Sequence, residues 1–296
     1  MQRYFSSEAF AKGSGLGTGG FVYNQLRLLG IPDATARAGQ YQLTQKSYES
    51  NSLIWRRGEH VDGWSFIVNG IVGTSIATDD GSTLSLEVYG PWSWFGEQSI
   101  FTSQTNLIEY VCLTDVDLIT LPSDLVRGWL VTVPEFAQYI SRMMANRLQL
   151  GAEMLALQKL GRPSAKVVLG LAQLVTSLAN QDSGEYQGNI SIPFSQGLFA
   201  SLCGVSRTVF SSNVLQLEKK HWLALTYSSI ELIDISRWRA LMELYRIKFE
   251  VSLMTSVDEI IDGAERYIPQ KRQARSLRGP ESGAGRISRR KNDHGR

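Results

Sequence analysis

The hydrophobic pattern of this chain changes its period at Pro134, and that change limits the folds it can adopt. Between about Ser50 and Leu121, short apolar runs alternate with turn residues, as they do in a sheet of short strands. From Pro134 to about Leu160 the only glycine is Gly151, and apolar residues recur at steps of three and four. This spacing is typical of an amphipathic helix. The sequence therefore predicts an α+β fold in which a β-rich domain precedes a long helix.

Five strands are predicted in the β-rich part, at residues 53–55, 64–68, 71–76, 84–88 and 108–113. The dipeptides Asn69-Gly70 and Asp80-Gly81 separate neighbouring runs, and both tolerate the positive φ of tight hairpin turns. Several short strands at this spacing predict a β-barrel or jelly roll over residues 45–133. Residues 1–30 read as irregular, and we assign residues 1–44 to an irregular or helical N-terminal segment.

The predicted helix at residues 134–161 is about 40 Å long at 1.5 Å per residue, which is more than one small barrel covers. We therefore expect its apolar stripe to be a dimer seam, and packing against its own barrel is the alternative. The predicted seam consists of Ile140, Met143, Arg147, Leu150, Met154 and Leu157.

Residues 163–235 contain two short helices joined by a turn. The parts are a helix at residues 196–202 capped by Ser195, a turn at Cys203-Gly204-Val205, and a second helix from Arg207 to about His221 capped by Ser206. Two helices joined by a glycine-containing turn form the helix-turn-helix unit. Two short strands are predicted after it, at residues 222–227 and 230–233, which is the arrangement of a winged helix-turn-helix.

These features, in this order, resemble the cyclic-AMP receptor protein/FNR family of bacterial transcription regulators. The stretch from Gln196 to Arg207, with residues 217–223 after it, is similar to the DNA-binding domain of that family. Gly58-Glu59, Asn69-Gly70 and Phe95-Gly96-Glu97 match landmarks of its cyclic-nucleotide-binding-like sensor barrel. The resemblance covers roughly residues 45–235. It implies a homodimeric regulator that binds an inverted-repeat operator, with a sensor barrel, a dimerisation helix and a winged helix-turn-helix.

The resemblance also implies roles for single residues at the DNA. Arg207 would read guanine in the major groove, and Ser195 and Gln196 would meet phosphates. The other predicted DNA contacts are Ser206, Thr208, Ser211, Ser212, Lys219 and Lys220. The family usually carries glutamate and a second arginine where this chain has Thr208 and Ser212, so its operator should differ from the family's commonest one. Double-stranded DNA and a second copy of the chain are the predicted partners, RNA polymerase is a further candidate, and no membrane is involved.

The sensor barrel departs from family members that bind cyclic nucleotides. In those proteins an Arg-Ser pair holds the cyclic phosphate, and the matching positions here are about Asn106 and Leu107. No arginine or lysine lies between Arg57 and Arg127, so a buried phosphate would lose its hydration without gaining an ion pair. We therefore expect no tight binding of cyclic AMP. The candidate effector pocket consists of Gly96, Glu97, Asn106 and Leu107, where Glu97 either contacts a ribose or caps loop amides.

The predicted barrel is rich in aromatic side chains, which either fill its core or line a site for an apolar effector of unknown identity. They are Trp64, Phe66, Trp92, Trp94, Phe95, Phe101 and Tyr110. No metal or cofactor is predicted. Cys112 and Cys203 lie in different domains, which does not suit an iron–sulfur cluster, and His60 is expected on the surface, which does not suit a haem ligand.

Composition argues against an enzyme. The three histidines lie at positions 60, 221 and 294, too scattered for a cupin-like metal site, and no Gly-x-Ser-x-Gly motif occurs. Two cysteines and the lack of an uncharged apolar run of about 18 residues favour a cytoplasmic protein. A sensor or scaffold of the same fold that has lost specific DNA binding is the alternative function.

The formal net charge of +2 comes from the last 30 residues, which hold nine basic and two acidic residues. We predict a helical extension over residues 236–266, with Ser236 as its N-cap, and a disordered basic tail over residues 267–296. The tail is either a non-specific DNA-contacting arm or a solvated segment without a role.

Overall fold

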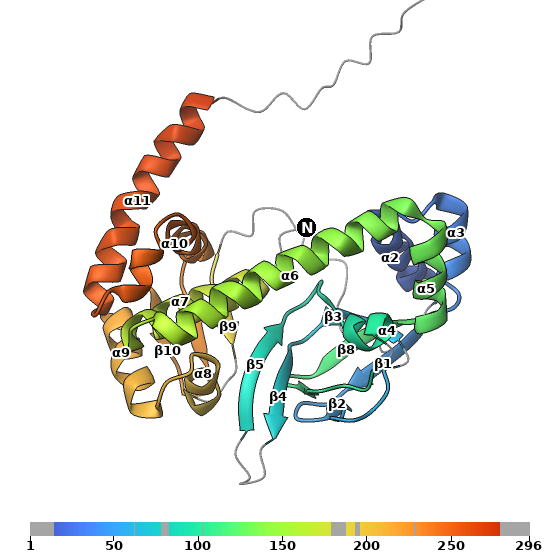
Figure 1. The fold of residues 1–296 in the computed structure, drawn as a ribbon, viewed down its shortest axis with the longest axis horizontal. Helices are drawn as coiled ribbons and strands as arrows, with labels where there is room; N and C mark the ends of the chain where they lie inside the picture. Colours follow the sequence, from blue (N-terminus) through green and yellow to red (C-terminus); the bar gives the residue numbers. More distant parts are fainter. Residues whose placement is uncertain are drawn as a thin grey trace, which may run out of the picture.

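The computed structural model describes residues 15–61, 63–77, 83–102, 104–178, 188–192, 196–227 and 229–278 (Figure 1). The elements before the long helix are α2 (Gly15–Leu28), α3 (Asp33–Gly39), β1 (Thr44–Tyr48), β2 (Leu53–Trp55), β3 (Gly63–Asn69), β4 (Val72–Ala77), β5 (Thr83–Tyr89), β6 (Trp94–Phe95), α4 (Glu97–Thr102), β7 (Glu109–Cys112), β8 (Val116–Pro122) and α5 (Ser123–Thr132). The long helix and the elements after it are α6 (Pro134–Leu160), α7 (Pro163–Leu178), β9 (Ile190–Ile192), α8 (Gln196–Leu202), α9 (Arg207–Lys219), β10 (Leu223–Leu225), β11 (Ile230–Leu232), α10 (Ile235–Ile247), the 3-10 helix η2 (Phe249–Leu253) and α11 (Val257–Arg278).

Two four-stranded antiparallel sheets form the N-terminal body, in the orders β1-β8-β3-β6 and β2-β7-β4-β5. Apolar side chains of both sheets meet in one core between them: Ile67, Val72, Tyr89, Phe95, Tyr110, Cys112, Val116 and Leu118. The five predicted strands are present as β2, β3, β4, β5 and β7. The mixed α+β fold is therefore confirmed, whereas β1, β6 and β8 were not predicted.

A second core lies on the other face of the first sheet, where α2, α5 and the first half of α6 cover it. Trp64 and Phe66 of β3 point into this core, because alternate residues of a strand face opposite sides. The prediction of irregular structure over residues 1–30 is wrong for α2. Its apolar residues Phe21, Val22 and Leu26 recur at helical spacing and are buried, which stabilises a helix despite its glycines.

Helix α6 runs as one element of 27 residues from the N-terminal body to the C-terminal body (Figure 1). Pro134 is its first residue, where the missing N–H of proline costs nothing. The next proline, Pro163, opens α7 after the break at Gly161-Arg162. The long helix predicted from the change of period is confirmed.

The C-terminal body packs α7 to α11 and the three-stranded sheet β10-β11-β9 around a third core. Helix α10 begins two residues earlier than a helix capped by Ser236 would, because its N-cap is Asp234. Asp234 accepts a hydrogen bond from the Ser236 backbone N–H at 3.2 Å. The prediction of disorder from Tyr267 is wrong for residues 267–278, which continue α11. Buried Ile260 and Ile261 dock the start of this helix, and residues 279–296 lie outside the described part.

Within the described residues, no single helix is both long and apolar enough to cross a membrane. Helices α8 and α9 reach the length and apolar character of a membrane span only when they are counted together, and a bend of 99° separates them.

Candidate nucleic-acid interface and sensor site

Helices α8 and α9 meet at 99° through a tight turn, an angle within the range of the helix-turn-helix unit. Gly204 adopts a φ of +63° in this turn, and a Cβ there would overlap the side chain of Gln158, so glycine is required. Gln158 belongs to α6 and donates a hydrogen bond to the Cys203 carbonyl at 3.1 Å. The long helix therefore holds the turn between the two helices in place.

Helix α9 has one buried face and one exposed face. Phe210, Val214 and Leu217 are buried, and Phe210 stacks on Phe199 of α8 with ring centroids 5.9 Å apart. The exposed face presents Thr208, Ser212, Leu215, Gln216 and Lys219. The first turn is capped as predicted, because the Ser206 hydroxyl accepts a hydrogen bond from the Val209 N–H at 3.3 Å.

The N-terminal ends of α8 and α9 lie side by side. The side chain of Arg207 crosses α8 at Gly197, where an added Cβ would stand 2.9 Å from Arg207 Nε. The Ser211 hydroxyl donates to Gln196 Oε1 at 2.8 Å. The fold thus gathers Gln196, Arg207 and Ser211 on one exposed corner, whereas Ser195 lies outside the described residues.

Lys219 and Lys220 have different environments, although both were predicted at the DNA backbone. Lys219 is exposed. The ammonium of Lys220 lies 3.1 Å from Asp258 and 3.3 Å from Asp262, both on α11. Hydrogen bonds to Asp258 and Asp262 raise the pKa of Lys220 above its usual value. Lys220 therefore takes part in the docking of α11, and its contact with DNA stays a prediction.

The turn between β10 and β11 carries an exposed aromatic residue that the sequence-based predictions missed. Tyr227 is fully exposed. The hydroxyls of Thr226 and Ser229 lie 2.6 Å apart and close the turn around it. The signal in the sequence was an aromatic residue inside a polar turn, at the position of a wing tip.

In the sensor barrel, Arg147 of α6 pairs with Glu97 at the start of α4. The same guanidinium donates to the Trp94 carbonyl and lies over the Tyr89 ring, 5.4 Å from its centroid. The carboxylate of Glu97 is buried. Arg147 therefore brings a cation from the long helix to a part of the barrel that has no arginine or lysine between Arg57 and Arg127.

The four predicted effector residues do not all face the same place. Gly96 lies against the ring of Trp55, and Glu97 is buried. Asn106 is also buried, and its Oδ1 accepts a hydrogen bond from the Ser99 hydroxyl at 3.0 Å. Leu107, in contrast, is 63% exposed. The Nδ2 of Asn106 has no hydrogen-bond partner among the described residues. The positions that match the phosphate-binding pair thus offer one neutral amide donor and no cation.

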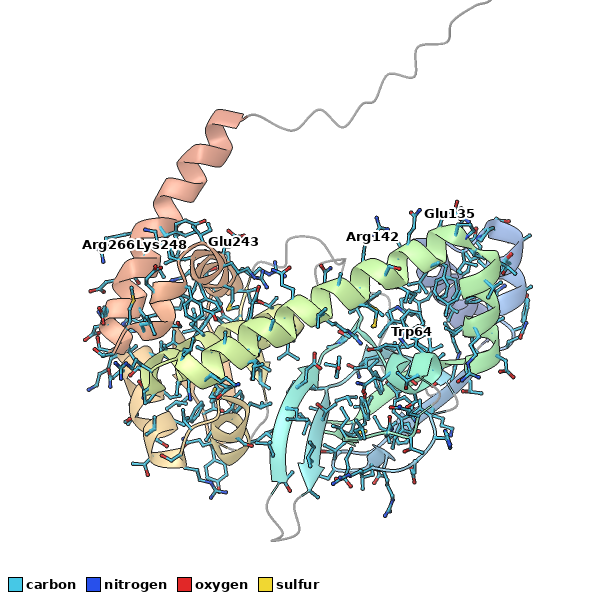
Figure 2. All side chains as sticks on the ribbon, in the orientation of Figure 1. Trp64, Glu135, Arg142, Glu243, Lys248 and Arg266 are labelled. Atoms are coloured by element: carbon cyan, nitrogen blue, oxygen red, sulfur yellow. The ribbon has the colours of Figure 1, made fainter. Side chains whose placement is uncertain are left out.

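The aromatic residues of the barrel pack in two separate cores. Trp64 stacks on Trp94 at 4.1 Å between centroids, on the helix-covered side of the first sheet. Phe95 stacks on Tyr110 at 5.3 Å between the two sheets. Trp92 and Phe101 are partly exposed, and His60 is exposed as expected. Figure 2 shows Trp64 beneath α6. These contacts favour aromatic residues that fill the core over aromatic residues that line an effector site.

The stripe predicted as a dimer seam lies against the chain's own two bodies. Ile140 is 5% exposed in the N-terminal core, and Leu157 is 1% exposed in the C-terminal core. Met143 and Met154 pack on the same two cores. Because Arg147 also faces its own barrel, this stripe does not point toward a second copy, and the alternative of packing on the chain's own barrel describes it better.

The opposite face of α6 is exposed and carries apolar residues at heptad spacing. We call these residues the outer stripe: Ala145, Leu148, Ala152 and Leu155. Leu148 is 76% exposed and Leu155 is 57% exposed. Arg142 and Glu135 also point away from both bodies (Figure 2).

Comparisons with known proteins agree with this geometry. Residues 45–132 match the cyclic nucleotide-binding domain. The CRP-like cAMP-activated global transcriptional regulator of Mycobacterium tuberculosis is 24% identical over 208 residues, 70% of this chain and 92% of that protein. Transcriptional regulator SdrP of Thermus thermophilus is 25% identical over 177 residues, 60% of this chain and 82% of that one. The solved structure of FixK2 from Bradyrhizobium japonicum has a TM-score of 0.57 at 18% identity, covering 66% and 95% of the two chains.

Proposed function

We propose that this chain, whose sensor domain and relatives support its membership of the cyclic-AMP receptor protein/FNR family, is a sequence-specific DNA-binding transcription regulator. Two of the relatives it matches are named as transcriptional regulators. In this proposal α8 and α9 form the helix-turn-helix, β10 and β11 form its wing, and α9 enters the major groove by its N-terminal residues.

The observation that carries the proposal is the exposed corner at the start of α9. Arg207 presents an exposed guanidinium beside Gln196 and Ser211, on a helix whose other face is buried. A guanidinium at the start of a recognition helix can donate two hydrogen bonds to guanine O6 and N7. The first turns of both helices also present backbone N–H groups that suit phosphates.

Selection of bound DNA from a random pool tests this function. We expect an enriched inverted repeat, and an affinity that falls steeply with salt because phosphate binding releases counterions. The Arg207→Ala variant in a parallel selection is the matched control and should lose one specified position. Absence of any enriched sequence would reject the regulator and favour the scaffold that has lost DNA binding, since α9 exposes only Arg207 and Lys219 as cations.

We propose further that two copies associate through the outer stripe of α6. Alternating alanine and leucine at heptad spacing allows two helices to approach closely. In this proposal a two-fold axis relates the two copies, and binding an inverted repeat requires their α9 helices to lie one DNA turn apart, about 34 Å.

We also propose that the sensor barrel does not bind cyclic AMP tightly. Glu97 is paired with Arg147, and Leu107 faces solvent. Asn106 accepts a hydrogen bond from Ser99, and its buried Nδ2 has no partner among the described residues, but it is neutral, so no free cation meets a cyclic phosphate at these positions. Calorimetric titration with cyclic AMP should show no binding in the micromolar range. An affinity of that order would contradict this part of the proposal and leave the DNA-binding part intact.

A further inference from the structure

A cavity of about 220 Å³ lies between the N-terminal and C-terminal bodies, away from the barrel interior. Four elements supply its walls: β5 of the sensor domain, α6, α7 and α8 of the DNA-binding domain. Val88, Leu150, Met154, Leu174, Phe199 and Leu202 make most of the lining apolar. A smaller apolar cavity of about 150 Å³ is known to bind benzene, so this one has room for a bicyclic molecule.

One polar side chain in this lining has an unused hydrogen-bonding atom. Gln173 of α7 is 7% exposed, and its Oε1 has no hydrogen-bond partner in the part of the chain that the structure describes. The charged residues of the lining are already engaged. Arg147 pairs with Glu97, and Glu87 accepts the Tyr89 hydroxyl at 2.6 Å. A buried acceptor without a donor is unfavourable, which points to a missing partner.

We propose that this cavity binds a small apolar molecule, such as a bicyclic aromatic, that carries one hydrogen-bond donor directed at Gln173 Oε1. The apolar walls would take the body of the molecule, and the donor would satisfy the buried amide oxygen. Burial raises the pKa of the Cys203 thiol to about 12, so the thiol is neutral and adds no charge to this lining.

The position of the cavity gives such a ligand a means of action. Strand β5 and helix α8 also touch directly, because the Ser85 N–H donates to the Ser201 hydroxyl at 3.0 Å (Figure 1). A molecule seated between β5, α6 and α8 would change how the sensor domain packs on the helix-turn-helix. This site differs from the pocket around Glu97 and Asn106, because neither residue lines it.

Indole and indene provide a matched pair of probes for the full chain. They have nearly the same shape, and only indole carries an N–H donor. In isothermal titration calorimetry we expect saturable binding of one indole per chain, with indene about three- to tenfold weaker, the effect of one hydrogen bond. The Gln173→Leu variant should bind the two probes equally.

A variant that fills the cavity tests the location independently of Gln173. A Cβ at Gly151 meets no atom within 4 Å, so Gly151→Leu can extend into the cavity without a clash. We expect it to weaken indole binding at least tenfold. Gly128→Leu is the matched control, because Gly128 is a helical glycine with equally open space outside this cavity, and it should bind indole as the unmodified chain does.

Four results would overturn the proposal. Three of them are no saturable indole binding, equal affinity for indole and indene in the unmodified chain, and unchanged binding in Gly151→Leu. The fourth is binding that appears only when Leu148→Glu and Leu155→Glu make the chain monomeric, because a second copy would then be what fills the cavity. Circular dichroism of each variant checks that it folds. The titrations contain no DNA, so their outcome is separate from that of the proposed regulatory function.

Discussion

Arg207 is the single residue on which the proposed sequence recognition depends most. Its guanidinium is exposed at the start of α9 and lies against Gly197 of α8, so its direction is restricted before DNA arrives. We expect Arg207→Ala to cost about 1–3 kcal/mol of specific binding and to relax one operator position. Competition assays with operators mutated at each base pair measure both effects.

Lys219 is the matched control for Arg207, since it is exposed on the same helix but far from its N-terminus. Lys219→Ala should weaken binding to all sequences about equally. It should also reduce by about 1 the slope of a plot of log affinity against log salt concentration. If Arg207→Ala behaves in this same way, Arg207 contacts only phosphate.

Cys203 makes the stability of the C-terminal body sensitive to alkaline pH. Burial raises the pKa of its thiol from an ordinary value of 9 to about 12. Folding therefore favours the protonated thiol, and this contribution is complete below pH 9 and is lost between pH 9 and 12. The loss can reach about 1.4 kcal/mol per pH unit. Urea unfolding of Cys203→Ala should show a smaller fall in stability between about pH 9 and 10.5 than the unmodified chain; equal falls would contradict this.

At the scale of elements, α6 separates its contacts between two faces. The inner face packs on this chain's own cores, and the outer stripe is exposed, where we propose that a second copy binds. We expect Leu148→Glu combined with Leu155→Glu to convert a dimer into a monomer, because four carboxylates would meet in an apolar seam. Light scattering coupled to gel filtration measures the mass.

Asn146→Glu adds a charge to an exposed position of α6 outside the outer stripe, so it should leave the dimer intact. A double-glutamate variant that still elutes as a dimer would place the association elsewhere on the molecule.

The ion pair between Arg147 and Glu97 joins α6 to the sensor barrel. Its side chains are 25% and 10% exposed, so loss of Arg147 leaves a largely buried carboxylate without its partner. We expect Arg147→Met to lower the free energy of unfolding by about 1–3 kcal/mol. Adding Glu97→Gln to this variant should recover part of the loss, because it removes the unpaired charge. Strictly additive losses in the double-mutant cycle would show that the pair contributes no coupling energy.

Local signals predicted some elements well. Helices α8 and α9 are marked by apolar spacing, predicted serine caps and the turn at Gly204, all within a few residues. Helix α6 is marked by its apolar spacing and by Pro134 at its start. The predicted bounds of all three agree closely with the structure. Strand β8 was missed because it lies between β1 and β3 and is largely buried on both faces, which hides the alternation of a half-exposed strand. Strand β6 has only two residues and leaves no pattern.

Contacts between distant segments could not be predicted in this way. Both faces of α6 carry apolar residues, so its periodicity alone does not tell which face meets the chain's own bodies. The roles of Arg147 and Lys220 depend on partners 50 and 42 residues away in sequence, Glu97 and Asp262. Such pairings follow from the docking of whole elements and have no local signature.

At the scale of the whole molecule, charge is distributed unevenly along the chain. Residues 279–296, which follow α11, hold five basic and two acidic residues. Removing them should lower the affinity for all DNA sequences and flatten the salt dependence, because fewer counterions are released. Base preference should not change. Titrations of a random duplex and of the selected operator at several salt concentrations test this. An unchanged dependence of affinity on salt concentration would show that the tail does not contact DNA.

The docking of α11 has a geometric consequence for α9. The first turns of α11 are tied to the end of α9 by Lys220, and to Trp222 and Arg237 by Glu265. The residues of α11 after Glu265, up to Arg278, extend away from the C-terminal body (Figure 1), a length of about 20 Å at 1.5 Å per residue. A tilt of about 10° at α9 would displace the end of this projecting segment by about 3 Å. A fluorophore at the end of α11 would thus report reorientations of α9.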